Sequence, residues 1–208
     1  MRHSDWYYDF VSPYSYFGFL RLQELGELHI DYHPVLFVEL LRQHGQKGPA
    51  EIPSKRMWTY RWCAWWAARN NIPFRFPAAH PFNPLPYLRL AIAAGNTPDA
   101  IGLIYDALWT TGADPADAAL VERLARSLGV DPAQLASPAV KDRLRQETED
   151  ALARGVFGVP THVVDQQLFW GAEATDFLKS YLADPAMFAS AEMARVSSLP
   201  VGVARKPG

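Results

Sequence analysis

Residues 5–16 read DWYYDFVSPYSY, and this short run predicts how the rest of the chain is arranged. Aromatic and β-branched side chains alternate in direction from Asp5 to Val11, which is typical of a strand. Ser12 and Pro13 follow at once. A serine N-cap with proline in the first helical position marks a helix start. We therefore expect a strand, and then a helix from about Pro13 to Gly26.

A second strand is predicted after this helix. Leu28, Ile30 and Tyr32 alternate with polar side chains and lead into residues 35–38. A helix between two strands forms a βαβ unit, in which the strands are parallel and the crossover is right-handed. The end of the chain returns to strands. There we expect a strand over 161–165, a turn at Gln166 and Gln167, a strand over 168–170, and a helix from about Ala172 to Leu182.

The middle of the chain is predicted to be helical. A long helix rich in tryptophan is expected from Ser54 to Asn70. Short helices follow, because a capping side chain before proline recurs and glycines stand where helices would stop. The start signals are Thr97-Pro98, Asp114-Pro115, Asp131-Pro132 and Ser137-Pro138, and the stop signals are Gly112, Gly129 and Gly155.

This order of elements predicts an α/β protein with a thioredoxin-like fold. A helical domain is inserted between the βαβ and ββα halves, and residues 158–161 (GVPT) lie where that fold keeps its cis-proline. We expect residues 1–40 and 156–184 to form the thioredoxin-like domain. Residues 41–155 would form the inserted helical domain, and residues 185–208 a C-terminal tail.

Composition narrows the function classes. Twenty basic and 22 acidic side chains give a net charge of -2 with no basic block, which argues against nucleic acid and anionic membranes as partners. The chain shows no signal-peptide pattern and no long apolar span, so we expect a cytoplasmic protein. Cys63 is the single cysteine, which excludes an internal disulfide and a thiolate zinc site. We name no metal ligand, and the sequence leaves a homodimer open.

Ser12 is the predicted reactive position. The first strand and the next helix start hold the C-x-x-C pair in redox thioredoxin folds, and Ser12 and Ser15 occupy those positions here. Disulfide exchange is therefore excluded. A helix N-terminus with a hydroxyl still suits an anion, and one charge-assisted hydrogen bond of roughly 1.5–3 kcal/mol can lower a bound thiol pKa by about two units. The alternative is that Ser12 is only an N-cap.

Three segments, read together and in order, resemble one enzyme family. Residues 9–16 (DFVSPYSY), 156–161 (VFGVPT) and 168–171 (LFWG) are similar to those of the 2-hydroxychromene-2-carboxylate isomerases. These enzymes are relatives of kappa-class glutathione transferases and of DsbA-type oxidoreductases. The resemblance extends from Trp6 to about Leu182.

The resemblance implies a glutathione site. Ser12 would face the glutathione sulfur, and the backbone of Val159 would pair with the cysteinyl part. The γ-glutamyl end would be held by the turn and helix start made of Trp170, Gly171, Ala172 and Glu173.

Two motifs depart from the family pattern. Where relatives carry Asn or Ser, then Asp, then Arg, this chain has Ala172, Glu173 and Ala174. Where they carry Gly-Asn, it has Gly45 and Gln46, a longer amide that can still reach the tripeptide. These departures affect glutathione affinity more than fold.

The resemblance also places two basic residues near the substrate, Arg42 and Lys55. An aromatic keto acid brings a carboxylate into an apolar pocket, and that carboxylate needs a cation. The reaction implied is the glutathione-dependent interconversion of 2-hydroxychromene-2-carboxylate and trans-o-hydroxybenzylidenepyruvate, or of a related intermediate of aromatic degradation. The alternatives are a kappa-type glutathione transferase or peroxidase, and a thioredoxin-like binding module without cysteines.

Overall fold

The computed structural model describes residues 2–203, so residue 1 and residues 204–208 of the expected tail lie outside the described residues. The described chain contains one four-stranded sheet in the order β2-β1-β3-β4. Its strands are β1 (His3–Tyr8), β2 (His29–Pro34), β3 (Thr161–Val164) and β4 (Gln167–Trp170). β1 is parallel to β2 and antiparallel to β3, and β3 is antiparallel to β4. The sheet therefore has the thioredoxin topology that the sequence predicts.

In the first half of the fold, tight turns end β1 and the helical crossover that leads to β2. β1 stops at Tyr8 rather than at Val11, because the carboxylate of Asp9 accepts a hydrogen bond from Val11 N–H and turns the chain. α1 (Pro13–Arg21) then begins with Ser12 as its N-cap, and a short 3-10 helix (Leu22–Leu25) follows it. Gly26, at φ 64, ends the crossover before β2.

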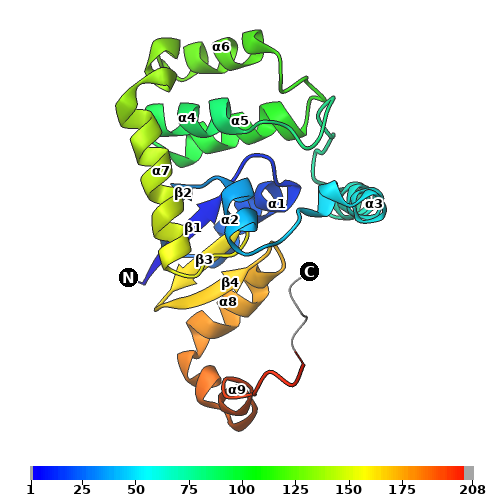
Figure 1. Ribbon diagram of the computed structural model, residues 1–208, viewed down its shortest axis with the longest axis vertical. Coiled ribbons are helices and arrows are strands. Elements are labelled where there is room, and N and C mark those ends of the chain that lie inside the picture. Colours follow the sequence, from blue (N-terminus) through cyan, green and yellow to red (C-terminus); the bar gives the residue numbers. More distant parts are fainter. Residues whose placement is uncertain (1, 204–208) are drawn as a thin grey trace.

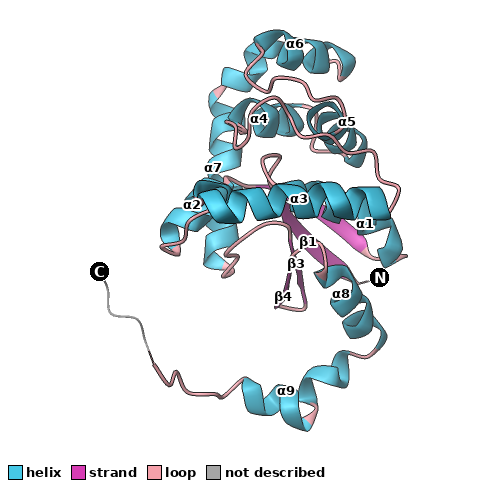
Figure 2. Ribbon diagram, turned by 90° about the vertical axis from the view of Figure 1, so that its right-hand side faces the viewer, coloured by secondary structure: helices cyan, strands magenta, loops and turns pink. Residues whose placement is uncertain are grey.

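The insertion is helical, as predicted. Its helices are α2 (Phe37–Gln43), α3 (Pro53–Arg69), α4 (Leu85–Ala93), α5 (Pro98–Trp109), α6 (Ala118–Ser127) and α7 (Pro138–Ala153), with 3-10 turns at Pro49–Glu51 and Pro132–Ala136. Figure 1 shows α4, α5 and α6 beyond one end of the sheet, with α7 running from them back to the strands. Figure 2 shows α3 lying across the molecule in front of the sheet.

Three further boundary predictions were wrong. Residues 35–38 do not extend β2, because Pro34 ends its pairing with β1 and the Asp9 carboxylate caps the start of α2 at Phe37 N–H. α6 begins after Asp117, whose side chain accepts from Ala119 N–H, and not at Asp114. α8 (Ala174–Ala183) begins two residues later than expected, after Gly171 at φ 98.

The tail contains structure that the sequence did not indicate. A 3-10 helix (Pro185–Ala189) and α9 (Ala191–Val196) follow α8, and the chain then extends away from the body (Figure 2). None of the described helices is long and apolar enough to span a bilayer.

The larger of the two hydrophobic clusters in the described chain runs through both halves and the insertion. It joins Trp6 and Tyr8 of β1 and Phe17 of α1 to Tyr105 and Trp109 of α5, all of which are fully buried. The inserted helices therefore pack on the sheet and on α1 directly. Phe10, in the loop that precedes Ser12, belongs to the same buried cluster.

Candidate active site

Ser12 lies at the junction of β1 and α1 and is 6% exposed. Its backbone is extended, and its side-chain oxygen accepts a hydrogen bond of 3.3 Å from Ser15 N–H. Within the described chain no acceptor takes the Ser12 hydroxyl proton. The N-cap role and a donor role are therefore compatible, since accepting from Ser15 N–H leaves this proton free for an anion at the helix start.

The loop before Ser12 is held by three side chains of the insertion. Tyr105 OH donates to the carbonyl of Asp9 (3.3 Å), and Trp109 Nε1 donates to the carbonyl of Phe10 (3.0 Å). His80 Nε2 donates to the carbonyl of Val11 (2.8 Å). Three consecutive carbonyls thus have separate side-chain donors, which fixes the backbone that presents Ser12.

Asp9 links this loop to the next helix. Its carboxylate is fully buried and accepts from Val11 N–H at 3.0 Å and from Phe37 N–H at 2.9 Å. Burial raises the pKa of Asp9 to about 7, against the opposing effect of these backbone hydrogen bonds. The loop that holds Ser12 and the start of α2 therefore share one buried acid.

The cis-proline loop lies against α1. The Val159-Pro160 peptide is cis, as predicted, and Val159 is 5% exposed. A Cβ on Gly18 of α1 would lie 2.9 Å from Pro160 Cγ, which shows how closely the two segments approach. Within residues 2–203 the backbone N–H and carbonyl of Val159 have no backbone partner, so they are available to a ligand.

Trp170 and Gly171 form the turn beside this loop. Gly171 N–H donates to Pro160 carbonyl at 2.9 Å, which ties the turn to the cis-proline. A Cβ on Gly158 would lie 2.7 Å from Trp170 Nε1, so any other residue at this position would displace the indole. Trp170 is 53% exposed and packs edge-on against Phe157.

The predicted γ-glutamyl residues are divided between buried and exposed positions. Ala172 is buried, and its carbonyl already accepts from Arg21 Nη1 and Thr175 Oγ1, both at 3.0 Å. Glu173 is exposed at the N-cap of α8 and makes no side-chain capping bond. Its negative charge contributes to the raised pKa of Tyr14, after burial and Cys63.

Three tryptophans on one face of α3, Trp58, Trp62 and Trp66, form a stripe that lies beside the start of α1. Neighbouring rings in the stripe lie 6.3 Å and 6.0 Å apart and are nearly parallel. Trp62 packs on Tyr14, two residues after Ser12, at 5.3 Å, and Trp58 is 62% exposed. Lys55 precedes Trp58 by three residues, so it lies on the same helix face at the outer end of the stripe.

Arg42 and Gln46 lie at the end of α2. The guanidinium of Arg42 makes two hydrogen bonds to Glu39 on its own helix, at 2.8 Å and 2.6 Å. Gln46 is exposed after Gly45, and its N–H donates to Leu41 carbonyl at 2.8 Å. Arg42 is therefore already paired, whereas Lys55 makes no ion pair within the described chain.

Three other side chains have local structural roles. Cys63 is fully buried and burial raises its pKa to about 12, so its thiol is unreactive. His162 is buried with Nδ1 2.9 Å from Ser4 Oγ, and burial lowers its pKa to about 3. Asn83 caps the start of α4 at Leu85 N–H. His80 holds the Ser12 loop, and nothing in the sequence indicates this role because His80 lies 69 residues from Val11 in the chain.

Comparison with known proteins agrees with this fold. The model of the DSBA-like thioredoxin domain family matches residues 5–183. A 2-hydroxychromene-2-carboxylate isomerase from Sphingobium xenophagum is 33% identical over 190 residues, which cover 86% of this chain and 97% of that protein. Human glutathione S-transferase kappa 1 is 24% identical over 209 residues, covering 88% and 92%. A solved 2-hydroxychromene-2-carboxylate isomerase superposes with a TM-score of 0.76 at 25% identity, over 94% of this chain and all of that one.

The fold, with its helical insertion and cis-proline loop, is that of the DsbA-like thioredoxin class. Within that class the chain belongs to the 2-hydroxychromene-2-carboxylate isomerase family. The isomerases and kappa transferases among its relatives support an enzyme with an isomerase-like or transferase-like role.

Proposed function

We propose that this protein is a glutathione-dependent isomerase. It would interconvert 2-hydroxychromene-2-carboxylate and trans-o-hydroxybenzylidenepyruvate, or a related intermediate of aromatic degradation. The observation that carries the proposal is the Ser12 hydroxyl, which lies at a helix N-terminus with its proton unclaimed within the described chain. The names of the relatives support both the reaction and the use of glutathione.

The residues around Ser12 fit the tripeptide. The unpaired backbone of Val159 suits the cysteinyl amide, and the turn at Gly171 with Glu173 beside it suits an amino acid head group. Gln46 is assigned to the same site through its exposed amide, and Trp170 and Ala172 through the turn they share. A cytoplasmic setting is part of this proposal, because glutathione keeps thiols reduced there. The homodimer also remains a prediction.

Each protein group has a separate task in this proposal. Bound glutathione would supply a thiolate that adds to the conjugated carbon, permits rotation about the former double bond and leaves unchanged. Ser12 donates a hydrogen bond to the sulfur and so favours the charged form. His80, Trp109 and Tyr105 hold the Ser12 loop still. Lys55 meets the substrate carboxylate, and the tryptophan stripe covers the aromatic ring.

The test is an isomerisation assay with and without glutathione. Parent protein should interconvert the two compounds only when glutathione is present, with no net consumption of it. Ser12→Ala should lower turnover by about 10- to 100-fold near neutral pH, equivalent to roughly 1.4–2.7 kcal/mol. Ser15→Ala is the matched control, because Ser15 is fully buried and its hydroxyl has no partner within the described chain.

The outcomes separate the candidates. Turnover without glutathione, or equal turnover in parent and Ser12→Ala, would contradict the proposal. Consumption of glutathione with an electrophile such as an aryl halide, and no isomerisation, would favour the kappa-type transferase that the human relative suggests. If the protein showed neither isomerase nor transferase activity, the remaining candidate would be a thioredoxin-like binding module.

A further inference from the structure

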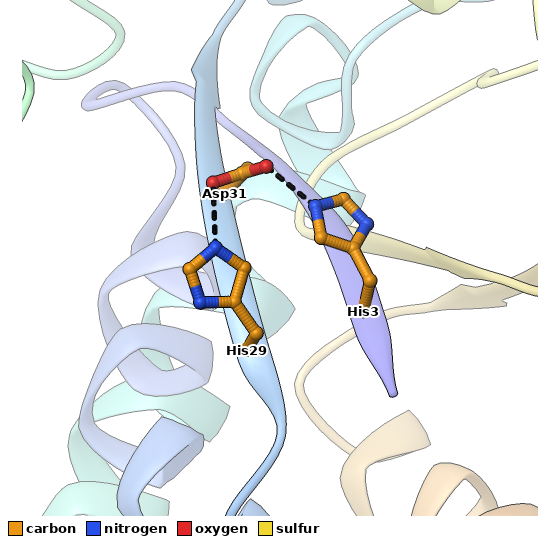
Figure 3. Close-up of side chains that lie close together, drawn as sticks. All are labelled: His3, His29 and Asp31. Atoms are coloured by element: carbon orange, nitrogen blue, oxygen red, sulfur yellow. Dashed lines mark hydrogen bonds and ion pairs between the residues drawn. The ribbon is translucent and has the colours of Figure 1, made fainter. Parts of the chain in front are cut away.

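Three ligating side chains meet on the sheet surface outside the Ser12 site. His3 of β1 and His29 and Asp31 of β2 converge as Figure 3 shows. His3 Nε2 lies 2.5 Å from one Asp31 oxygen, and His29 Nε2 lies 3.2 Å from the other. One ligand atom from each residue lies within 4.8 Å of the others.

The strand register produces this cluster. His3 and His29 are direct neighbours across the parallel β1–β2 pair. Asp31 follows His29 by two residues, and side chains two apart in a strand point to the same face. The three positions are thus fixed by the sheet. His3 lies 26 residues before His29, so neither the spacing of the three residues nor their surroundings marks them as a ligand set beforehand.

Asp5, the residue opposite Asp31 in the β1–β2 pair, has a carboxylate that is already bound by other side chains. Asp5 pairs with Asp31 in register, and its carboxylate is engaged by His33 Nε2 at 2.8 Å and by Arg154. Within the described chain no lysine or arginine pairs with Asp31, whose partners are the two imidazoles. With neutral imidazoles the cluster carries one negative charge.

The donor set selects a class of ion. Two imidazole nitrogens and one carboxylate suit Zn²⁺ and similar borderline first-row cations, whereas Mg²⁺ and Ca²⁺ prefer all-oxygen ligands. His3, Asp31 and His29 are each about half exposed, with side chains 47%, 50% and 59% accessible, so an ion can reach them and keep water in a fourth position. Small rotamer changes suffice, because the ligand atoms are already this close.

We propose that His3, His29 and Asp31 form a surface site for Zn²⁺ or a similar borderline divalent cation. The site is distinct from the Ser12 site, because His3 opens β1 whereas Ser12 follows the carboxyl end of the same strand. An ion held here joins the first residues of β1 and β2. It therefore links the two parallel strands. Because the ion binds the folded chain and not the unfolded one, it stabilises the folded state.

The test is calorimetric titration of Zn²⁺ into the full chain, without a histidine tag and without glutathione, since both bind zinc. Parent protein should bind one equivalent saturably and show a higher Tm in Zn²⁺ than in buffer, with no such rise in Mg²⁺. His29→Ala and Asp31→Asn should each weaken binding by at least about tenfold and abolish the Tm rise, since each removes one of only three ligands. Both positions are exposed, so these variants should fold.

His44→Ala is the matched control, because His44 is an exposed histidine outside the cluster. It should bind Zn²⁺ and respond in Tm as the parent does. The proposal is overturned if the parent binds no zinc saturably, or if His29→Ala and Asp31→Asn bind it as tightly as the parent. Neither outcome affects the Ser12 proposal, because the readout contains no glutathione.

Discussion

His80 is the side chain of the insertion that contacts the residue next to Ser12. Its Nε2 donates to Val11 carbonyl, and its Nδ1 lies 2.7 Å from Tyr60 OH of α3. Burial lowers the pKa of His80, against the opposing effect of the hydrogen bond that Nε2 donates to the Val11 carbonyl, so the ring is neutral near pH 7. A neutral imidazole donates through Nε2 and leaves Nδ1 as an acceptor beside the Tyr60 hydroxyl, which lies equally close, at 2.7 Å, to the His80 carbonyl. His80 is therefore a positioning residue, which acts through the loop.

We predict that His80→Gln lowers turnover about 3- to 10-fold, the equivalent of one lost neutral hydrogen bond of roughly 0.6–1.4 kcal/mol. KM for the substrate should change little, because His80 touches the loop and not the ligand. Steady-state kinetics across pH test this. Asn83→Ala, on the same loop, is the control and should leave turnover unchanged. Equal kinetics in His80→Gln and parent would show that the carbonyl bond at Val11 does not position Ser12.

At the scale of elements, α7 is joined to the sheet through His33. His33 Nδ1 lies 2.6 Å from Glu147 of α7, and Nε2 lies 2.8 Å from Asp5 of β1. Burial alone would lower the pKa of His33, but the hydrogen bonds and charges of Glu147 and Asp5 outweigh it, so the net shift is upward. A raised histidine pKa stabilises the fold fully below its unfolded value, and that contribution is lost as pH rises through the folded pKa.

Accordingly, His33→Gln should cost roughly 1–3 kcal/mol of unfolding free energy near pH 6, and less near pH 9. Urea unfolding at both values measures the two costs. His44→Gln, at an exposed histidine, should cost nothing at either pH. A cost for His33→Gln that is equal at both pH values, or larger at pH 9, would contradict the assigned charge state.

Helix propensity and overpacking have opposite effects on the stability of a Gly18→Ala variant, where α1 meets the cis-proline loop. Alanine is a better helix former than glycine by about 1 kcal/mol. At Gly18, however, its Cβ would lie 2.9 Å from the rigid ring of Pro160. Since overpacking costs roughly 1–3 kcal/mol, we predict that Gly18→Ala lowers stability overall. Gly102→Ala in α5 meets Phe19 at 3.3 Å and should cost less. A stabilised Gly18→Ala in thermal unfolding would show that this contact relaxes freely.

The sequence predicted those elements whose signals are local. Ser12, Thr97 and Ser137 cap helices as expected, because capping before proline needs only neighbouring residues. The start of α2 was missed because its cap comes from Asp9, 28 residues earlier. The backbone partners of His80 and the meeting of His3 with Asp31 were also unpredictable, since each depends on how distant segments pack.

At the scale of the whole molecule, the insertion and the thioredoxin-like half share one core. Trp6 and Phe17 belong to the same buried cluster as Tyr105 and Trp109. Side chains of the insertion also hold the loop before Ser12. Separate unfolding of the insertion would expose both the core and that loop, so the two parts should be one cooperative unit.

We therefore predict a single unfolding transition. Far-ultraviolet circular dichroism, which reports helices throughout the chain, and tryptophan fluorescence should give the same midpoint in urea. Trp109→Phe, which removes the donor to Phe10 carbonyl within the core, should shift both midpoints together. Two midpoints in the parent would show that residues 41–155 unfold as a domain of their own.

The central claim is that Ser12 stabilises a thiolate brought by glutathione. Its most direct test is the pH titration of the ultraviolet absorbance of the bound thiolate in parent protein and in Ser12→Ala. The account predicts a thiol pKa in the parent below that of free glutathione, and one about 1–2 units higher in Ser12→Ala, because alanine donates no hydrogen bond. Identical titrations, with Ser12→Ala merely about 1 kcal/mol less stable, would show that Ser12 is only a helix cap.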